Sequence, residues 1–417
     1  MSAEDVRVAI DKISVDIERR KEVLRTLEAK KILLHRQLNA FLDPVARMPL
    51  EISSEIFIQC LPPFPEPGSS HIPMLFLNVC KAWTEIALST PALWSAIHVQ
   101  FPRPKGFGNA LENWFQRARS RPLSISFRGD FDDDVATAVR QRAMQLENLD
   151  IYDADDRSGI VDLLGGLGPG SFPLLKTLTI GASEINKDGD DVCFDPESIL
   201  DIFLLAPVLV ECTLDSLICH SPSLYDRIAR EQLVLPSLRR LRFGRSLKDI
   251  YTHDGILRYL TLPSLRTLFL SMKISSDDLI SFLKRSSPPL RHLVISEAGV
   301  SNFLQLDPYL RLLPTVTHFE LCGPSGLVQE LFAALVESPS SLLPHLQSLR
   351  IILSDWETPQ SLWEVLHRAL SVRRTHLTHF TMEALQGPNS ELRAVFRQLV
   401  AEGMDLSIGN DFYSYVP

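Results

Sequence analysis

The sequence predicts an α/β protein in which a long N-terminal helix and a compact helical module precede an irregular solenoid of alternating strands and helices. Three observations support this prediction: a seven-residue apolar repeat near the N-terminus, a cluster of short amphipathic segments after it, and a leucine period in the remainder. Of 66 leucines in 417 residues, 16 lie in the first 160 positions and 50 in the remaining 257. We therefore expect three parts, at residues 1–43, 44–101 and 102–417.

Residues 10–41 are predicted to form one helix, because the stretch contains no proline or glycine and its apolar residues follow a seven-residue repeat. The first and fourth positions of the repeat hold Ile10, Ile13, Ile17, Leu24, Leu27, Leu34, Leu38 and Phe41, with interruptions only at Arg20 and Lys31. A helix of this length spans about 48 Å at 1.5 Å per residue. Asp43-Pro44 ends it, since a proline disfavours helical geometry in the residue before it.

The apolar seam of this helix leaves two interpretations open. It can pair with a second copy as a coiled coil, which makes the protein a homodimer through residues 10–41, or it can lie on its own chain. In a parallel dimer the flanking positions bring Asp16 toward Lys21, which attract, and Lys30 toward His35, which do not. Charge therefore specifies self-pairing only weakly.

Residues 47–99 are predicted to form a module of three short amphipathic helices. Pro49 stands where a first helical residue tolerates proline, and Thr90-Pro91 opens the third helix. The apolar stripes of the first two helices are Ile52, Ile56, Phe57 and Cys60, then Leu75, Val79, Trp83, Ile86 and Ala87. Three such helices bury little surface by themselves, so we expect an apolar face to be left over for a partner.

This module resembles an F-box, in the F-box-like form common in fungal proteins. The resemblance covers residues 47–99 and is carried by Pro49-Leu50-Glu51-Ile52, Ile56-Phe57, Cys60-Leu61, Val79-Cys80-Lys81-x-Trp83, Ile86-Ala87-Leu88 and Leu93-Trp94. Two features depart from the family pattern: Met48 replaces the usual leucine before the proline, and an insert from Pro62 to Pro73 lengthens the first loop. Neither departure removes an apolar contact.

The resemblance implies docking onto a Skp-type adaptor protein, and through it onto a cullin, in a ubiquitin ligase. Carried over by position, the adaptor-binding residues are Pro49, Leu50, Ile52, Ile56, Phe57, Val79, Cys80 and Trp83. Some of these residues have the alternative role of holding the three helices together. For Trp83 we favour that role, because a bulky aromatic in so small a module is often its core. Pro49 and Leu50, at the leading edge, are favoured for the adaptor contact.

The leucine excess has a period. Five units start at a proline that is followed by apolar residues at offsets of two, five and seven, with the prolines at Pro173, Pro236, Pro263, Pro288 and Pro344. Four weaker units keep the same offsets: Leu146/Leu149/Ile151, Leu209/Cys212/Leu214, Val316/Phe319/Leu321 and Leu377/Phe380/Met382. The nine units follow one another at spacings of 25 to 34 residues. Offsets of five and seven are a strand period, so each unit is expected to contribute one strand.

Helical stretches lie between these strands, at residues 195–205, 275–285, 324–338 and 358–370, and several open with Ser, Thr or Asp as an N-cap would. A helix and an edge strand are also expected within residues 109–127. One strand and one helix per unit is the arrangement of a solenoid. It resembles a leucine-rich repeat, and an F-box followed by such repeats is a familiar combination. The units are longer than usual and lack an asparagine ladder, so we expect an irregular arc.

The residues at offsets four, six and eight are expected to face the open side of the sheet, because strand side chains alternate. That side then holds Asp150, Tyr152, Glu211, Asp215, Arg240, Arg242, Phe269, His292, His318, Glu320, Arg350, His379 and Glu383. The candidate substrate-binding residues are Arg240, Arg242, Phe269, His292, His318, Glu320 and Arg350. Arg240, Arg242 and Phe269 are the favoured anchor, since Arg and aromatic residues are enriched at hot spots. An ordinary solvated strand face is the alternative.

Composition excludes several function classes. The formal net charge is −9, and no segment has the basic excess of a nucleic-acid binder. No apolar stretch reaches the length of a membrane span, and the N-terminus lacks the apolar core of a secretory signal. The six cysteines form no CxxC pair, so we expect small hydrophobes in a reduced intracellular protein. The acidic clusters 129–134 and 187–191 do not fit a calcium loop and are expected to be solvated loops.

Signatures of catalysis are missing from the sequence. There is no GxxxxGK[ST], GxSxG or HExxH motif. His292 and His318 share one column of the repeat and are expected about 5 Å apart. Only Glu320 or Cys322 stands near enough to complete a metal site with them. We therefore expect no metal, no cofactor and no enzyme activity.

These expectations combine into a cytoplasmic or nuclear adaptor. The F-box-like module would dock on a Skp-type adaptor, and the repeat arc would recruit a protein substrate for an SCF-type cullin-RING ubiquitin ligase. The alternative is a non-ligase scaffold that organises partners through the repeat arc and the N-terminal helix. An enzyme with a site in the concavity of the arc is a third, weaker interpretation.

Overall fold

The computed structural model describes residues 3–153, 163, 165–182, 196–214, 232–244, 255–270, 276–296, 306–410 and 413–416. The chain forms two compact units, one of residues 1–99 and 110–126 and the other of residues 100–109 and 127–417. Asp215, Cys193, Cys219 and the acidic cluster 187–191 lie outside the described residues. The two units are considered separately below.

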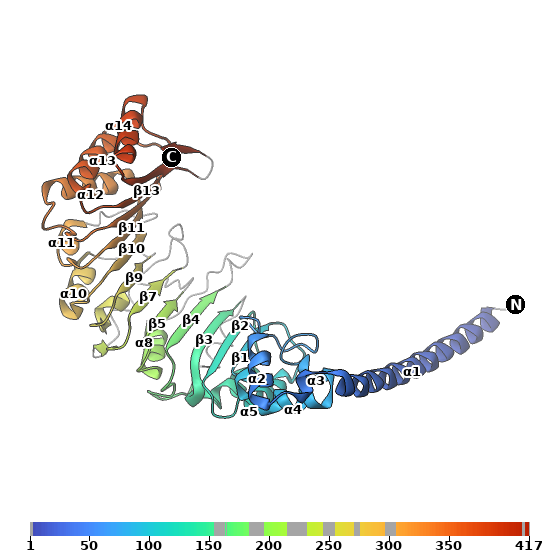
Figure 1. The fold of residues 1–417 in the computed structure, drawn as a ribbon. Helices are drawn as coiled ribbons and strands as arrows, with labels where there is room; N and C mark the ends of the chain where they lie inside the picture. The colour runs from blue at the N-terminus through green and yellow to red at the C-terminus, as the bar shows by residue number, and fades with distance from the viewer. Residues whose placement is uncertain are drawn as a thin grey trace. The chain divides into compact units, whose positions relative to one another are not determined.

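The first unit begins with a single long helix, α1 (Ala3–Leu42) (Figure 1). The predicted helix is confirmed, and it starts seven residues earlier than the seven-residue repeat indicates. Its C-terminal part lies against the module, where Asn39 Nδ2 donates to the Val79 carbonyl at 3.2 Å and Arg36 donates to the Leu77 carbonyl. The helix ends one residue before Asp43-Pro44, as the sequence predicts.

The module contains the short helices η1 (Val45–Arg47), α2 (Leu50–Gln59), α3 (Phe76–Val79), α4 (Lys81–Ser89) and η2 (Pro91–Trp94). The second predicted stripe is not one helix, because Cys80 adopts extended backbone angles (φ −156°, ψ 173°) and separates α3 from α4. Pro49 precedes α2 as its N-cap rather than opening it. The apolar residues of α3 and α4 follow one helical period across Cys80 because the side chains of both helices face the same core.

Three aromatic rings form the core of the module. The ring of Phe57 stacks on that of Phe76, with centroids 4.2 Å apart, and contacts that of Trp83 at 4.8 Å. Trp83 Nε1 donates to the Asp43 carboxylate, whose other oxygen accepts from Val45 N at 2.9 Å. Trp83 therefore packs the module and ties it to the end of α1, as its favoured role requires.

The next elements along the chain are β1 (Ala96–Gln100), α5 (Phe107–Ala118) and β2 (Leu123–Arg128). A helix and a strand are thus present where residues 109–127 predict them. Within the first unit, Ser124 N donates to the Ser95 carbonyl at 2.8 Å, and Trp94 meets Trp114 edge-on with centroids 4.9 Å apart. The residues that follow η2 therefore extend the core of the helical module.

The second unit is built on a large, mostly parallel sheet whose strands alternate with helices, consistent with a leucine-rich-repeat-like arc. Its strands follow one another in the order β3 (Leu146–Asp153), β4 (Thr177–Ala182), β5 (Glu211–Leu214), β7 (Arg240–Phe243), β9 (Thr267–Leu270), β10 (His292–Ser296), β11 (His318–Gly323), β12 (Ser348–Leu353), β13 (His379–Glu383), β14 (Asp405–Gly409) and β15 (Ser414–Val416). The nine predicted strands are all present. Strand β14 lacks an anchoring proline, and the sequence pattern missed it.

The register confirms the repeat offsets. Leu241, Leu268, Leu293 and Phe319, all at offset five, pair with one another across β7, β9, β10 and β11. All four side chains are buried. The offset-seven residues form a second buried column in the same register, for example Leu270 beside Ile295. The two apolar columns are the core of the sheet face that the helices cover.

Helices lie along one side of this sheet (Figure 1). They are α6 (Asp133–Arg140), η3 (Ala143–Gln145), α8 (Pro196–Leu205), η4 (Gly255–Tyr259), α10 (Ser276–Ser286), α11 (Leu306–Leu310), α12 (Ser325–Glu337), α13 (Gln360–Arg373) and α14 (Ser390–Ala401). A separate parallel pair, β6 (Leu233–Val234) with β8 (Leu260–Thr261), precedes β7 and β9.

Two features of the helix starts add to the expectations from sequence. The acidic cluster 129–134 is not only a solvated loop, because Asp132 is the N-cap of α6 and accepts a hydrogen bond from Val135 N at 3.2 Å. Helices α12 and α13 begin after Pro324 and Pro359 without a side-chain cap of their own. The first amide of α12, that of Ser325, instead donates to Asp355 Oδ2 at 2.6 Å.

The last strand, β15, runs antiparallel to β14, with an irregularity at Ile408 and Gly409. A side chain on Gly409 would place its Cβ 2.6 Å from the Tyr413 carbonyl oxygen, so the close approach of the two strands requires glycine there. The Tyr415 hydroxyl donates to the Leu385 carbonyl at 2.7 Å, which fixes β15 against the loop between β13 and α14.

Arg373 is a charged side chain buried inside the second unit, with 4% of its surface exposed. From the end of α13 it donates to the carbonyls of Leu335 (3.3 Å), Ser338 (3.3 Å), Leu342 (2.6 Å) and Leu343 (3.2 Å). These carbonyls belong to the last turn of α12 and the segment after it, and burial lowers the pKa of the guanidinium. Arg373 therefore satisfies a helix C-terminus of the neighbouring repeat.

Replacing Arg373 should strongly destabilise the second unit. Arg373→Met keeps most of the apolar volume but removes the guanidinium that donates to all four carbonyls. The carbonyls of Ser338 and Leu343 keep a backbone donor, whereas those of Leu335 and Leu342 lose the donor described above, so we expect a loss of about 2–4 kcal/mol in the free energy of unfolding. Arg374→Met is the matched control, since Arg374 is 61% exposed and makes one ion pair, with Glu402; it should cost about 0.5 kcal/mol or less. Urea unfolding measures both. Equal effects would contradict the structural role of Arg373.

Candidate functional site

The predicted adaptor-binding residues fall into two sets in the first unit. Pro49, Leu50, Ile52 and Ile56 are exposed, with exposed fractions of 47%, 53% and 37% for the last three. Phe57 and Cys80 are buried, and Val79 and Trp83 are half-buried. The first set therefore lies on the surface of α2 and at its start, while the second set belongs to the core.

Helix α2 presents its apolar residues outward. Ile52 and Ile56 are four residues apart and share one exposed face, whereas Ser53 and Phe57, one position further along, share the buried face. Ser53 is fully buried, and its hydroxyl donates to the Val45 carbonyl at 3.0 Å. A helix that buries a serine and exposes two isoleucines has an apolar face in excess of what its own module uses.

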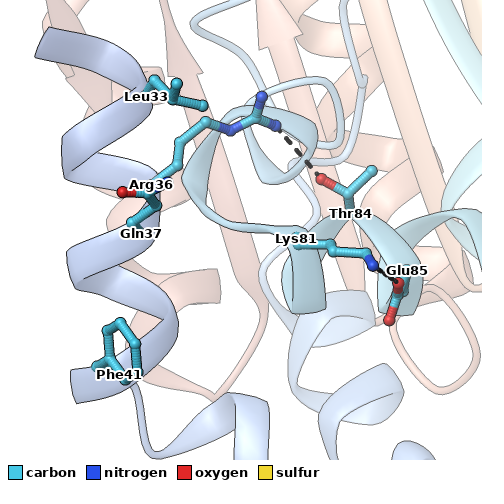
Figure 2. Close-up of a pocket in the computed structure, with 7 residues that line it drawn as sticks. All are labelled: Leu33, Arg36, Gln37, Phe41, Lys81, Thr84 and Glu85. Carbon is cyan, nitrogen blue, oxygen red and sulfur yellow. Dashed lines mark hydrogen bonds and ion pairs between the residues drawn. The ribbon is translucent and has the colours of Figure 1, made fainter. Parts of the chain in front are cut away.

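A groove of about 600 Å³ lies between α1 and α4 in the same unit (Figure 2). It is lined by Leu33, Arg36, Gln37, Phe41, Lys81, Thr84 and Glu85. Figure 2 shows Arg36 reaching from α1 to the Thr84 hydroxyl, at 3.5 Å, and Lys81 pairing with Glu85 at 3.7 Å. Sequence reasoning missed this groove, because it assigned Phe41 to the seam of α1 and placed no element opposite it.

The predicted substrate-binding residues lie on the strands of the second unit, and most of them are paired within it. Arg240 forms an ion pair with Glu211 of the neighbouring strand at 2.8 Å. The guanidinium of Arg242 lies 4.1 Å from the centroid of the Phe269 ring, and its Nε donates to the Gly244 carbonyl at 2.9 Å. Of the expected anchor, Arg242 and Phe269 are therefore brought together across β7 and β9, whereas Arg240 pairs with Glu211 on β5.

A second group gathers around Glu320. Its carboxylate bonds His292 Nε2 at 3.0 Å and lies 3.7 Å from Arg350, which in turn pairs with Glu383 at 2.6 Å. The hydrogen bond with His292 is the main reason that the pKa of Glu320 lies below its usual value, and the positive charges of His292, Arg350 and Arg242 act in the same direction. His318 lies beside His292, with ring centroids 5.8 Å apart. The structure thus unites four predicted residues in one network.

A buried apolar cluster occupies strand positions that were expected to face the open side. Phe269 is 9% exposed and clusters with Val294, Cys322 and Ile352, all of which are buried. These four residues occupy offsets six and eight, where strand alternation predicts open-side positions. Phe269 is therefore a buried ring that supports Arg242, and little of its surface is available to a ligand. The sequence contains a signal for this burial, because these four residues at offsets six and eight are apolar.

Metal and thiol chemistry have little support in the described part of the chain. Within it, no three His, Cys, Asp or Glu side chains gather in a way that could hold a metal ion. His379 pairs with Asp405 at 2.6 Å and is separated from His318 by β12. Cys80, Cys212 and Cys322 are buried free cysteines, and burial raises the pKa of the Cys212 thiol.

Comparison with known proteins gives no assignment, because no family model and no curated protein matches the chain. Among the described residues, no helix combines the length and the apolar character needed to cross a membrane. The functional argument therefore rests on the two surfaces described above: the exposed apolar face of α2 and the open side of the sheet.

Glu320→Gln tests the charge network on the sheet. The folded-state pKa of Glu320 is lowered, so its contribution to stability is present above the pKa of the unfolded carboxyl, about 4.3, and is lost as the pH falls through the folded value. We expect the variant to lose about 1 kcal/mol of unfolding free energy at pH 7 and the difference to shrink at pH 3.5. Urea unfolding at both pH values measures this. Exposed Glu357→Gln is the control, and a deficit unchanged by pH would contradict the network.

Proposed function

We propose that the protein is a substrate-recruiting adaptor of an SCF-type cullin-RING ubiquitin ligase, acting in the cytoplasm or nucleus. In this proposal the F-box-like module of residues 44–101 docks on a Skp-type adaptor, and the leucine-rich-repeat-like arc of residues 102–417 binds a protein substrate. The observation that carries it is the outward apolar face of α2, where Leu50, Ile52 and Ile56 are exposed while Ser53 is buried.

That face has the composition of a protein-docking site. Met48, Pro49 and Leu50 lead into Ile52 and Ile56, so one side of the chain from residue 48 to residue 56 is apolar and exposed. Burying such side chains against a partner releases roughly 25 cal/mol per Å² of apolar surface. Of these residues, Pro49, Leu50, Ile52 and Ile56 are among those that the F-box resemblance assigns to the adaptor contact. The buried residues of the same motif, Phe57 and Cys80, hold the face in place.

In this proposal the chain promotes ubiquitination by holding the substrate near the ligase and takes no part in the chemistry. The chain supplies two binding surfaces, and the ligase supplies the charged conjugating enzyme that meets the lysines of the substrate. The charged open side of the sheet, with Arg240, Arg242, His292, His318, Glu320 and Arg350, is the proposed substrate side. Its mixed sign suits a protein or peptide better than a nucleic acid. No metal or cofactor has a part in the proposal.

Substitution of the leading edge of α2 tests the docking. Pro49→Ala combined with Leu50→Ala removes exposed apolar surface without touching the aromatic core, so the module should keep its fold and lose at least tenfold in affinity for a Skp-type adaptor. Co-purification with the adaptor and cullin, quantified by mass spectrometry, measures this. Leu385→Ala is the control, since Leu385 is 50% exposed in the other unit. Unchanged capture by a folded double variant would refute the docking assignment.

A non-ligase scaffold is the second candidate, and α1 favours it. The seam residues along α1 are exposed, for example Ile10 (56%), Ile17 (46%), Leu24 (56%) and Leu34 (65%). An exposed apolar stripe of this length, interrupted only at Arg20 and Lys31, does not stabilise a monomer. A second copy would cover it as a coiled coil. Two copies would then organise two sheets and two modules.

Sedimentation of the full chain tests this candidate. If the seam dimerises, the wild type should sediment as a dimer at micromolar concentration, and Leu24→Asp with Leu27→Asp should return it to a monomer. Val15→Asp is the matched control, because Val15 is 71% exposed but lies off the seam. A wild type that is monomeric at all concentrations would remove the seam as an argument for a scaffold.

A further inference from the structure

One feature of the second unit has no part in the surfaces described above. The tetrapeptide Pro-x-Leu-Arg recurs in three consecutive repeats, at residues 236–239, 263–266 and 288–291. The fourth residue of each, at offset three from the proline, is Arg239, Arg266 or Arg291. Strand alternation assigned a side to offsets four to eight only, so the sequence pattern gave these three arginines no role.

The structure places the three arginines in one row. Each comes immediately before the first residue of its strand, at the edge of the sheet where β7, β9 and β10 begin. Their backbones are joined, since Arg266 N donates to the Arg239 carbonyl and Arg291 N donates to the Arg266 carbonyl, both at 2.8 Å. Neighbouring members of the row are therefore about 4.8 Å apart, the spacing of adjacent strands.

The chain before the row is fixed in place. Strands β6 and β8 pair just before the first two Pro-x-Leu-Arg segments, and Leu235 N donates to the Thr261 carbonyl at 3.1 Å. Leu238, Leu265 and Leu290, the third residues of the three segments, are all fully buried. The arginines are thus mounted on rigid backbone, which lowers the entropy cost of binding a ligand there.

The three arginines are exposed, and no described carboxylate pairs with them. Among the residues that the structure describes, none of the three has a side-chain hydrogen bond or ion pair. Lys176, at the same offset in an earlier repeat, differs in this respect: it pairs with Glu147 at 2.6 Å. Arg240, next to the row, is occupied by Glu211. The row is therefore a concentration of positive charge that the described residues around it do not neutralise.

We infer that Arg239, Arg266 and Arg291 form the docking site for an acidic segment of a partner protein, whose side chains present carboxylate or phosphoryl groups. Arg is the side chain that binds both groups bidentately. An extended chain places alternate side chains roughly 7 Å apart on one side, which long arginine side chains on strands about 4.8 Å apart can reach. A row of three cations in a chain of net charge −9 is too small a basic surface for a nucleic acid.

The neighbouring charged residues suit this role less well. Arg240 and Arg350 already have carboxylate partners within the sheet, so an incoming anion would have to displace Glu211 or Glu383. The free row needs no such exchange. If the acidic segment belongs to the ligase substrate, this inference rests on the proposed function. The binding itself needs neither the Skp-type adaptor nor the ligase.

Fluorescence anisotropy with the full chain tests the inference. The probes are labelled eight-residue peptides: one of glutamates, one of alternating phosphoserine and glycine, one of glutamines and one of lysines, with an eight-nucleotide single strand of DNA as a further probe. We expect binding of the glutamate or the phosphoserine peptide, and the tighter of the two identifies the source of the anionic groups. Added salt should weaken this binding.

The triple variant Arg239→Gln/Arg266→Gln/Arg291→Gln should lose at least tenfold in affinity for the acidic peptide. The matched control, Arg121→Gln/Arg368→Gln/Arg397→Gln, removes the same charge from three exposed arginines elsewhere and should change the affinity less than twofold. Equal losses in the two triples, an unchanged affinity in the row triple, absence of binding by both acidic peptides, or tighter binding of the DNA would overturn the inference.

Capture of the Skp-type adaptor by the same row triple separates the two proposals. Retained capture together with lost peptide binding supports the inference, because it leaves the docking half of the molecule intact. Failure of peptide binding in a wild type that captures the adaptor overturns the inference alone. Failure of adaptor capture with intact peptide binding overturns the proposed function and leaves the acidic-segment site standing.

Discussion

The register of the parallel hydrogen-bond ladder is the constraint on which the second unit depends. It aligns the offset-five residues Leu241, Leu268 and Leu293 in one buried column, and the offset-seven residues in another. A slip of one residue on any strand would turn its apolar side chains away from the helices and its charged side chains toward them. The same ladder therefore sets the core, the charged open side and the row of arginines at the edge.

Much of this arrangement follows from the sequence, because a period of two within a period of about thirty residues specifies strand, offset and face together. Strand β14 was missed since no proline precedes Leu406 and Ile408 at the usual distance. Pairings such as Arg240 with Glu211 were also beyond reach, since they depend on which strands are neighbours and on how far each side chain extends. The sequence pattern gave the arginine row no place, because alternation holds within a strand, and Arg239, Arg266 and Arg291 stand just before one.

The two units present surfaces of different physical character. The α2 face is apolar, and its burial against a partner is hardly affected by salt. The arginine row and the open side of the sheet act through charge, and moderate ionic strength screens interactions between exposed charges that are more than about 10 Å apart. The sequence grouped Pro49, Leu50, Ile52 and Ile56 in one motif, and the structure places all four on the surface. The sequence divided the motif only in part, with Trp83 as core and Pro49 and Leu50 as contact, because the buried Ser53 and the break at Cys80 are fixed by packing.

Strand β15 has a consequence for how the sheet meets other molecules. A parallel sheet built from repeats has an open edge that can accept a further parallel strand, including one from another copy. Because β15 reverses direction and pairs closely with β14 at Gly409, it presents a short antiparallel edge with a displaced register. End-to-end stacking of the repeats into filaments is thereby disfavoured at this edge, and a bulkier residue at Gly409 would reopen it.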